Sequence, residues 1–323
     1  MEPPFINEER IKELLPMNEC ILVMEEMFRS IAEGSVQQPL RSIMWLPNKK
    51  GLLGMMPGYA AGTGMMGIKV ITIFHENSSL GYPSHQGVVL LFDAKHGEPV
   101  MIFDAGEITA IRTAAASAVA TRLLANEKAE TLAIIGSGVQ AEKHVEAIIC
   151  VRKIKQINIW SRQQRNAENL AVKIRKQYEL DVIVKSNVQT VVENADIICT
   201  VTSSAQPVLL GEWIPKGAHI NAVGSSTPAA RELDTKAILQ CSFFTDKYES
   251  VFNEAGDFLI PEKEGAITKE YVKAELSEVI TGKKKGRTDS DEITLFKSLG
   301  ISAEDIFSAW HIYKKLQPSS FNR

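Results

Sequence analysis

The 323-residue sequence has few cysteines, no marked excess of either charge and no long apolar run. Its four cysteines are far apart and form no CxxC pair, so we predict neither a metal site nor a disulfide framework. Three of them, Cys150, Cys199 and Cys241, lie in apolar runs that are typical of buried thiols. The 36 basic and 39 acidic residues give a net charge of −3, without the basic excess common in nucleic-acid-binding proteins. We therefore expect no nucleic-acid partner.

Signals for secretion or membrane insertion are also missing from the sequence. The first residues, MEPPFINEER, have neither the basic region nor the apolar region of a signal peptide. No apolar stretch reaches the roughly 20 residues that cross a bilayer. We expect a soluble, cytoplasmic protein with no membrane partner. The length suits about two domains of roughly 100–200 residues each, and 45% apolar and 23% charged residues are typical of a globular chain.

The apolar pattern of the first 125 residues indicates a helix, a set of strands and a second helix. Residues 18–33 have helical spacing, with Asn18 as the expected cap and Gly34 at the end. Four β-rich runs follow, LRSIMWL, GIKVITIF, GVVLLFD and PVMIFD, and a turn containing Gly97 joins the last two as in a hairpin. The Ala-rich run EITAIRTAAASAVATRLLA is expected to be a helix that leads into the second domain.

From Thr131 onward, β-rich runs alternate with helical segments. The expected strands are TLAII, INIW, DVIVK, DIICTVT, HINAVG and SFFTD, and a final helix over 303–316 follows the turn LFKSLG and is expected to pack on the first domain. Such alternation predicts a parallel, doubly wound sheet. The predicted fold class is therefore α/β, with one Rossmann domain and a smaller α+β domain.

The segment 136–141, GSGVQA, has the GxGxxA pattern of a dinucleotide-binding turn. It directly follows the apolar strand LAII and opens a helix, which is the context that the motif requires. Gly136 would permit the tight turn, Gly138 would let the backbone approach a pyrophosphate, and Ala141 would allow close packing of helix on strand. The free N–H groups of the helix would bind the phosphates. The alternative is a Gly-rich turn that binds no nucleotide.

An acidic residue is missing at the end of the second strand of this domain. Such a residue binds the ribose 2′-hydroxyl of NAD and repels the 2′-phosphate of NADP. This chain has Ser161 and Arg162 there, with Arg165 shortly after. A hydroxyl and two guanidinium groups suit a phosphate. We therefore predict that NADPH is preferred and NADH is second; the alternative is that both arginines are ordinary surface residues.

Three cations lie in otherwise apolar runs outside the dinucleotide-binding region. They are Arg41 in LRSIMWL, Lys69 in GIKVITIF and Arg112 on the Ala-rich helix. A charged side chain among apolar neighbours usually needs a partner, so the three together suggest a small anionic substrate. Singly, each is also compatible with an edge position or a snorkelling side chain. None of the histidines is assigned a catalytic role, and His144 is expected on the exposed side of its helix.

Taken together, seven stretches resemble the ornithine cyclodeaminase/mu-crystallin family over nearly the whole chain. They are MPGYA (56–60), GIKVITIF (67–74), YPSHQGVVLLFDAKHGEPV (82–100), ITAIRTAAASAVAT (108–121), IIGSGVQA (134–141), HINAVGSSTPAARELD (219–234) and DEITLFKSLG (291–300). The resemblance implies a Rossmann domain at 121–299 and a substrate-binding and dimerisation domain formed by 1–120 with 300–323. It also implies a homodimer.

The resemblance further implies roles for individual residues. Arg41, Lys69 and Arg112 would bind and polarise a carboxylate-bearing substrate. We expect Lys69 and Ser226 to be the catalytic residues, Ser226 through a hydrogen bond to the substrate or an ordered water; the alternative is that Ser226 only caps the backbone near the cofactor. The residues expected around the cofactor, from the resemblance and from the motif together, are Ser84, Arg112, Thr113, Gly136, Gly138, Val139, Gln140, Ser161, Arg162, Arg165, Thr202, Asn221, Val223, Gly224 and Ser298.

Two carboxylates of the cyclodeaminases have no counterpart in this chain. Ser226 stands where they have an aspartate proposed to transfer a proton, and Gly54 stands where they have a glutamate. Neither residue can do the acid–base work of cyclodeamination. The resemblance then favours NAD(P)H-dependent reduction of Δ1-pyrroline-2-carboxylate or Δ1-piperideine-2-carboxylate to L-proline or L-pipecolate. The alternatives are an ornithine cyclodeaminase, an alanine or other amino-acid dehydrogenase, and a non-catalytic NADPH-dependent binding protein of the mu-crystallin type.

Overall fold

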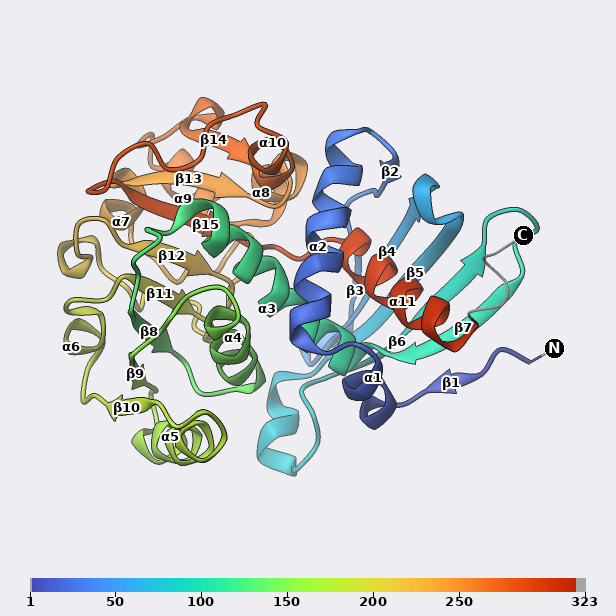
Figure 1. Ribbon diagram of the computed structural model, residues 1–323, viewed down its shortest axis with the longest axis horizontal. Helices are drawn as coiled ribbons and strands as arrows, with labels where there is room; N and C mark the ends of the chain where they lie inside the picture. Colours follow the sequence, from blue (N-terminus) through green and yellow to red (C-terminus); the bar gives the residue numbers. More distant parts are fainter. Residues whose placement is uncertain (1, 318–323) are drawn as a thin grey trace. The chain divides into compact units, whose positions relative to one another are not determined.

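The computed structural model describes residues 2–317, apart from the side chains at positions 75, 78 and 79. The chain divides into two compact units (Figure 1). One unit comprises the residues up to Thr113 and those from Ile301 on, and the other comprises Ala114–Gly300. The boundary falls inside one long helix, α3 (Ala105–Leu124). The boundary that the family resemblance implies, and the roles it gives to the two domains, stay predictions.

The first unit is built on a seven-stranded sheet in the order β1-β7-β6-β5-β4-β2, with β3 also paired to β4. All pairs are antiparallel except β1 with β7. The expected hairpin of β6 and β7 is confirmed, and its turn contains Gly97 at φ +74°. The strands are β1 (Phe5–Ile6), β2 (Val36–Gln37), β3 (Ser42–Trp45), β4 (Leu52–Ala60), β5 (Met65–Ile73), β6 (His85–Asp93) and β7 (Pro99–Asp104).

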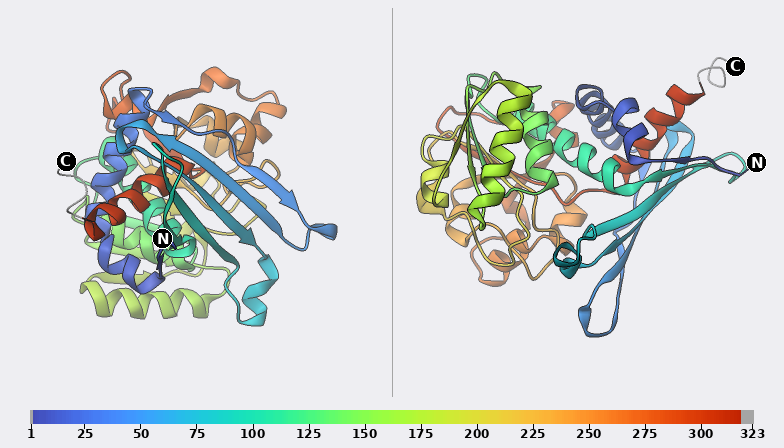
Figure 2. Two further views of the ribbon diagram at one scale, coloured as in Figure 1. Left: turned by 90° about the vertical axis from the view of Figure 1, so that its right-hand side faces the viewer. Right: turned by 90° about the horizontal axis from the view of Figure 1, so that it is seen from below.

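Helix α11 (Ser302–Leu316) lies against β4, β5 and β6 and is covered in turn by α2 (Met17–Ala32), with α1 (Glu8–Leu14) nearby (Figure 2). Two glycines of the sheet allow this close approach. A Cβ on Gly58 would lie 2.8 Å from Cδ1 of Ile306, and one on Gly67 would lie 3.2 Å from Cγ1 of the same residue. The final helix therefore belongs to the core of the first unit.

Several large apolar side chains of this sheet stay exposed. Met44 is 52% exposed, Trp45 47% and Met66 37%, although their neighbours in the strands are apolar as well. Met44 and Trp45 are neighbours on β3, whereas Met66 lies on β5 opposite Tyr59, farther along the sheet. Exposed large apolar side chains are common at interaction sites.

The second unit contains an eight-stranded, fully parallel sheet in the order β10-β9-β8-β11-β12-β15-β13-β14. The order reverses at β8, which confirms the predicted doubly wound α/β fold. The strands are β8 (Thr131–Ile135), β9 (Gln156–Trp160), β10 (Asp181–Val184), β11 (Ile197–Thr200), β12 (His219–Ala222), β13 (Cys241–Thr245), β14 (Val272–Glu275) and β15 (Ile293–Lys297). The helices are α4 (Val139–Ile149), α5 (Gln164–Tyr178), α6 (Val188–Val192), α7 (Thr235–Leu239), α8 (Tyr248–Glu254), α9 (Gly256–Lys263) and α10 (Leu276–Ile280).

Four expectations about local structure were wrong. Part of the expected turn LFKSLG belongs to β15, whose five residues are all buried; the charged Lys297 at its end made this segment look like a turn. Helix α2 begins one residue before Asn18, after Pro16, which fixes the backbone without a side-chain cap. His144 is fully buried and faces α3, where Oγ of Ser117 lies 2.9 Å from its Nε2. Cys150 is exposed, because it stands at the end of α4.

Candidate active site

The segment between β8 and α4 has the geometry of a phosphate-binding turn. Gly136 has φ +128°, and a Cβ there would lie 2.7 Å from the carbonyl oxygen of Val201. Gly138 caps α4, offers no side chain to the first-turn N–H groups, and has no atom within 4 Å of the place a Cβ would take. Ala141 is fully buried where α4 packs on the sheet. These residues fit a pyrophosphate at the helix N-terminus, next to the first-turn residues Val139 and Gln140.

The loop after β9 lies beside this turn. The hydroxyl oxygens of Ser137 and Ser161 are 2.8 Å apart, so a hydrogen bond joins the ends of the first two strands. Arg162 follows in this loop and Arg165 in the first turn of α5, and both are exposed. Ser161 and the two arginines thus follow the end of the strand at which a 2′-phosphate is expected.

Further expected cofactor residues follow the adjacent strands β11, β12 and β15. Thr202 comes after β11, Val223 and Gly224 come after β12, and Ser298 comes after β15. Because β8, β11, β12 and β15 are parallel neighbours, their carboxyl ends meet at one edge of the sheet, which is where ligands of doubly wound sheets bind. Ser226 is half-buried in the same loop as Gly224.

The loop after β12 is held by a buried carboxylate that the sequence analysis missed. Glu232 is fully buried and accepts hydrogen bonds at 2.8 Å from Oγ1 of Thr200, at 2.8 and 2.7 Å from N and Oγ1 of Thr202, and at 2.7 Å from N of Gly224. It therefore ties the carboxyl ends of β11 and β12 together.

A buried ion pair holds the same loop from the other side. Nζ of Lys297 lies 2.9 Å from Oδ2 of Asp257 and donates to the carbonyl oxygen of Ser225 at 2.6 Å, and both charged side chains are fully buried. Oδ1 of Asp257 accepts hydrogen bonds from the backbone of Glu232 and Leu233. The sequence showed Lys297 and Asp257 only as single charges in apolar runs, because their pairing depends on the fold.

One expected cofactor residue has its side chain engaged inside the unit. Asn221 lies within β12, is fully buried, and donates from Nδ2 to Oγ1 of Thr121 at 3.0 Å. Its Oδ1 lies 3.3 Å from Nε2 of His219. These contacts make the amide a link between β12 and α3, and its role at the cofactor stays a prediction.

In the first unit, the predicted cations come together around two acidic residues. Nζ of Lys69 on β5 lies 2.8 Å from Oδ2 of Asp305, and Nε of Arg112 on α3 lies 3.0 Å from Oδ1 of the same residue. Arg112 also pairs with Glu304. All four side chains are at most 4% exposed. Lys69, Arg112, Asp305 and Glu304 are called the buried quartet below.

The environment of the buried quartet changes the proton affinity of its cations. Burial, together with the charges of Arg112 and Arg41, lowers the pKa of Lys69 to about 8, although Asp305 opposes this. Burial also acts against the charge of Arg112, but Asp305 and Glu304 outweigh it and raise the pKa of the guanidinium. Arg41, half-buried just before β3, thus lies near enough to act on Lys69.

Two further residues expected at the cofactor, Thr113 and Ser84, belong to this unit. Thr113 follows Arg112 on α3 and is buried, and Ser84 precedes β6, with Oγ 2.9 Å from Nδ1 of His85. The acids Glu304 and Asp305 were missed because two acids in the first turn of a helix are ordinary. The signal that could have found them is the need of buried cations for partners.

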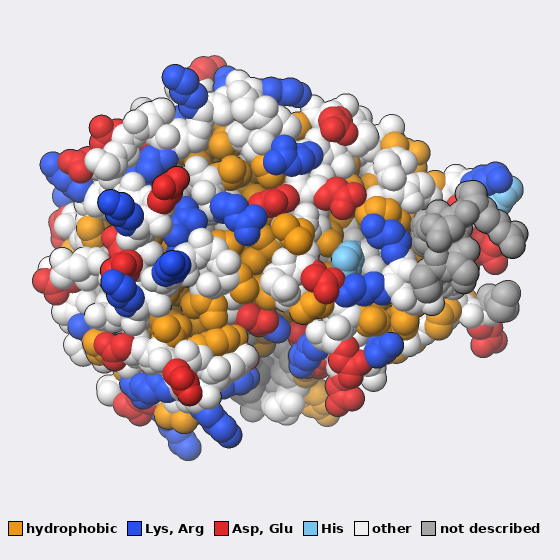
Figure 3. Space-filling view, viewed as in Figure 1, with side chains coloured by type: hydrophobic (Ala, Val, Ile, Leu, Met, Phe, Trp, Pro, Cys, Tyr) orange, Lys and Arg blue, Asp and Glu red, His pale blue; other side chains and the backbone are white. Residues whose placement is uncertain are grey.

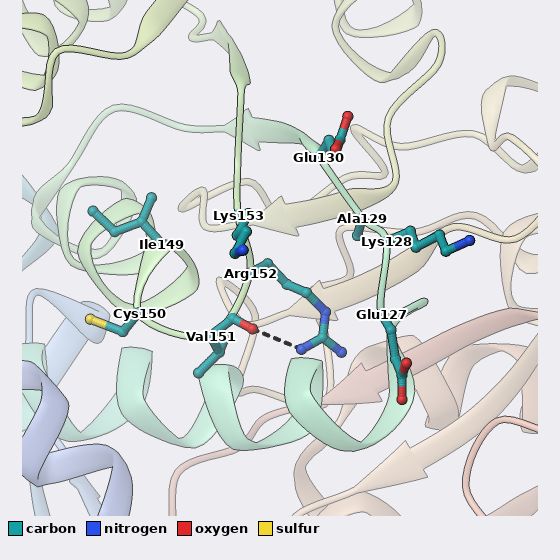
Figure 4. A pocket seen from close by; sticks show the side chains of 9 residues that line it. All are labelled: Glu127, Lys128, Ala129, Glu130, Ile149, Cys150, Val151, Arg152 and Lys153. Carbon is teal, nitrogen blue, oxygen red and sulfur yellow. Dashed lines mark hydrogen bonds between the residues drawn. The ribbon is translucent and has the colours of Figure 1, made fainter.

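A surface pocket of the second unit lies at the opposite edge of its sheet (Figure 4). Its lining includes Glu130, which precedes β8, and Arg152, which precedes β9, so it is near the amino ends of these strands. Arg152 donates to the carbonyl oxygens of Thr121, Ala125 and Val151 at 2.8–3.0 Å. Its guanidinium therefore caps the end of α3, and this pocket is separate from the candidate site.

Comparison with known proteins identifies close relatives along the whole chain. The model of the ornithine cyclodeaminase/mu-crystallin family matches residues 1–320. The ketimine reductase mu-crystallin of Mus musculus is 38% identical over 315 residues, covering 96% of this chain and 96% of that protein.

Two solved structures have the same fold over nearly their entire length. The Δ1-pyrroline-2-carboxylate reductase of Thermococcus litoralis, in complex with NADH and L-proline, is 35% identical with a TM-score of 0.95 and 97% of each chain covered. An archaeal alanine dehydrogenase dimer with bound NAD is 28% identical with a TM-score of 0.93, covering 100% of this chain and 98% of that one.

Proposed function

The chain belongs to the ornithine cyclodeaminase/mu-crystallin family, and we propose that it is an oxidoreductase that reduces cyclic ketimine carboxylates with a nicotinamide cofactor. Its substrates are Δ1-pyrroline-2-carboxylate and Δ1-piperideine-2-carboxylate, and its products are L-proline and L-pipecolate. The observation that carries the proposal is the gathering of Lys69 and Arg112 in the buried quartet, with Arg41 near, in a chain that has Ser226 and Gly54 in place of the cyclodeaminase carboxylates.

In this proposal the edge of the parallel sheet holds the cofactor. The turn at Gly136 and Gly138 binds the pyrophosphate, and Ser161, Arg162 and Arg165 bind a 2′-phosphate, so that NADPH is preferred over NADH. When bound, the nicotinamide supplies the hydride that is added to C2 of the imine. The relative with NADH and L-proline bound supports a nicotinamide cofactor in this fold.

The cations of the first unit bind and orient the substrate. Arg41 and Arg112 hold its carboxylate, so that the C=N carbon is fixed for hydride addition. Lys69 contacts the carboxylate or the imine region and keeps positive charge near it. A protonated cyclic imine is already electrophilic, so one proton and one hydride complete the reduction without a strong protein acid. Ser226 hydrogen-bonds the ring nitrogen or an ordered water.

We also propose that the protein is a cytoplasmic homodimer. The exposed apolar side chains Met44, Trp45 and Met66 on the sheet of the first unit support a contact with a second copy, and the archaeal relative is a dimer. Charged side chains of both signs are interspersed over the face seen in Figure 3, which fits small-molecule chemistry better than nucleic-acid binding. Within residues 2–317, no helix combines the length and the apolar character needed to cross a bilayer.

Substrate turnover tests the proposal. NADPH oxidation is followed with Δ1-pyrroline-2-carboxylate, and in parallel the protein is given L-ornithine with NAD⁺ and assayed for ammonia and proline. We expect NADPH oxidation with the imine and no ammonia from ornithine. Ammonia and proline from ornithine would contradict the meaning given to Ser226 and Gly54. Tight NADPH binding without turnover of any imine or amino acid would favour a binding protein instead.

A further inference from the structure

Asp305 contacts both cations of the buried quartet. Its Oδ1 is 3.0 Å from Nε of Arg112, and its Oδ2 is 2.8 Å from Nζ of Lys69. Glu304, the neighbouring acid, forms an ion pair with Arg112, and the charge and hydrogen bond of Asp305 favour the ammonium of Lys69. Both acids are at most 1% exposed.

The position of Asp305 is itself fixed by the start of α11. The backbone N–H of Ala303 donates to Oε1 of Gln38 at 3.1 Å, and that of Ile301 lies 3.4 Å from Oε1 of Glu304. The helix is pressed against Gly58 and Gly67 of the sheet, where a side chain would collide with it. The backbone that carries Asp305 is thus held in place, whereas Lys69 has a long, flexible side chain.

We propose that Asp305 is the positioning residue of the substrate site: it holds the ammonium of Lys69 and the guanidinium of Arg112 at a fixed separation and keeps the proton on Lys69. The proposal rests on the proposed function, because it assumes that these cations bind the substrate carboxylate. Preorganised charges act on a bound substrate without the cost of rearranging, so a positioning residue affects turnover without touching substrate.

The charges around Lys69 act on its pKa in opposite directions. Asp305 on α11 favours the charged ammonium, while Arg112 on α3 and Arg41 before β3 disfavour it, and Oγ1 of Thr109 on α3 lies 3.4 Å from Nζ. Removing the charge of Asp305 removes the carboxylate whose charge and hydrogen bond favour the ammonium. The pKa of Lys69, about 8 in the intact protein, should then fall, whereas removal of the Glu304 charge should leave it nearly unchanged.

The test is a matched pair of substitutions, Asp305→Asn and Glu304→Gln, read through the pH dependence of an inert ligand. Pyrrole-2-carboxylate is a planar analogue whose charge is constant between pH 6 and pH 10, and its inhibition constant is measured with NADPH present. In the intact protein we expect binding to weaken as pH rises through about 8. In Asp305→Asn the midpoint should fall by about one pH unit, which makes binding at pH 8 several-fold weaker. In Glu304→Gln the midpoint should stay.

Equal midpoints in the two variants would overturn the proposal, and so would a midpoint in Asp305→Asn that matches the intact protein. If Asp305→Asn does not fold, Asp305→Glu carries the test: it keeps the charge but moves it, so kcat should fall about tenfold or more while the pH midpoint stays near 8. An unchanged kcat would then overturn the positioning role. Failure of the intact protein to reduce any cyclic imine would be a failure of the proposed function, which the first assay detects separately.

Discussion

The two units each bury a network of charges, but they compensate those charges differently. In the buried quartet of the first unit, cations contact carboxylates, and β5, α3 and α11 each contribute. In the second unit, Glu232 accepts hydrogen bonds from two threonine hydroxyls and two backbone N–H groups, which are neutral donors, and a separate buried ion pair of Lys297 with Asp257 holds the same loop. The donors to Glu232 do not titrate, although burial raises the pKa of the Glu232 carboxyl itself and the charge of Lys297 opposes that rise. The ammonium of Lys69, with a pKa of about 8, responds to pH and to a bound anion. The first network therefore suits substrate chemistry, and the second suits holding strand ends in place.

The largest expected effect comes from removing the carboxylate of Glu232. Glu232→Ala leaves the donors of Thr200, Thr202 and Gly224 buried without an acceptor, so the free energy of unfolding should fall by about 3–5 kcal/mol. Denaturant unfolding measures it. Glu264→Ala is the matched control, because Glu264 is an exposed acid paired with Arg231 at 3.4 Å and should change stability by less than about 1 kcal/mol. Similar losses in both variants would mean that the network does not hold the loop.

Removing the ammonium of the first network should mainly affect turnover. Lys69→Met keeps an apolar stem of similar length but leaves Asp305 with Arg112 alone, so we expect kcat/KM for the cyclic imine to fall about 100- to 1000-fold. Affinity for NADPH, measured by fluorescence titration, should change little, because the proposed phosphate contacts lie in the second unit. An unchanged kcat/KM in this variant would contradict the proposed role of Lys69 in substrate binding and turnover.

The arginines after β9 should separate the two cofactors. Arg162→Ala removes one charge-assisted contact with the 2′-phosphate, so the dissociation constant of NADPH should rise about tenfold while that of NADH stays the same. Arg165→Ala should act in the same direction. Lys173→Ala on the same helix is the control, because this exposed lysine stands in the second half of α5 and pairs with Glu142 at 2.7 Å. Equal losses for NADPH and NADH would refute the preference for NADPH.

The smallest change separates the two glycines of the turn. Gly138→Ala adds a methyl group into open space, so the free energy of unfolding should change by no more than about 1 kcal/mol, through the lower conformational entropy of the unfolded chain. NADPH should bind more weakly, because the methyl group occupies space proposed for the pyrophosphate. Gly136→Ala should instead destabilise the fold, because φ is +128° and the new Cβ would lie 2.7 Å from the carbonyl oxygen of Val201. Thermal unfolding with and without NADPH measures both. Unimpaired NADPH binding by Gly138→Ala would place the phosphates elsewhere.

Local patterns predicted the elements whose apolar spacing was uninterrupted. The strand β8, the turn at Gly136 and the helix α4 were all visible, because each is defined by a few consecutive residues. The strand β15 was not, since Lys297 ends an otherwise apolar run and finds its partner Asp257 forty residues earlier in the chain. His144 looked like a surface residue because nothing local indicates that its ring is covered by Ser117.

The sequence by itself determined the doubly wound fold, the glycine-rich turn between β8 and α4 and membership of the family, since these depend on spacing within short segments and on residue identity along the chain. Only the tertiary structure decided which charges meet. Arg112 and Asp305 are 193 positions apart, and Thr200 and Glu232 are 32 apart. A buried charge must be compensated, but its own neighbourhood in the sequence does not say by which group. Packing of α11 on the sheet brings Glu304 and Asp305 to Lys69 and Arg112. The ends of β11 and β12 bring the donors of Thr200, Thr202 and Gly224 to Glu232.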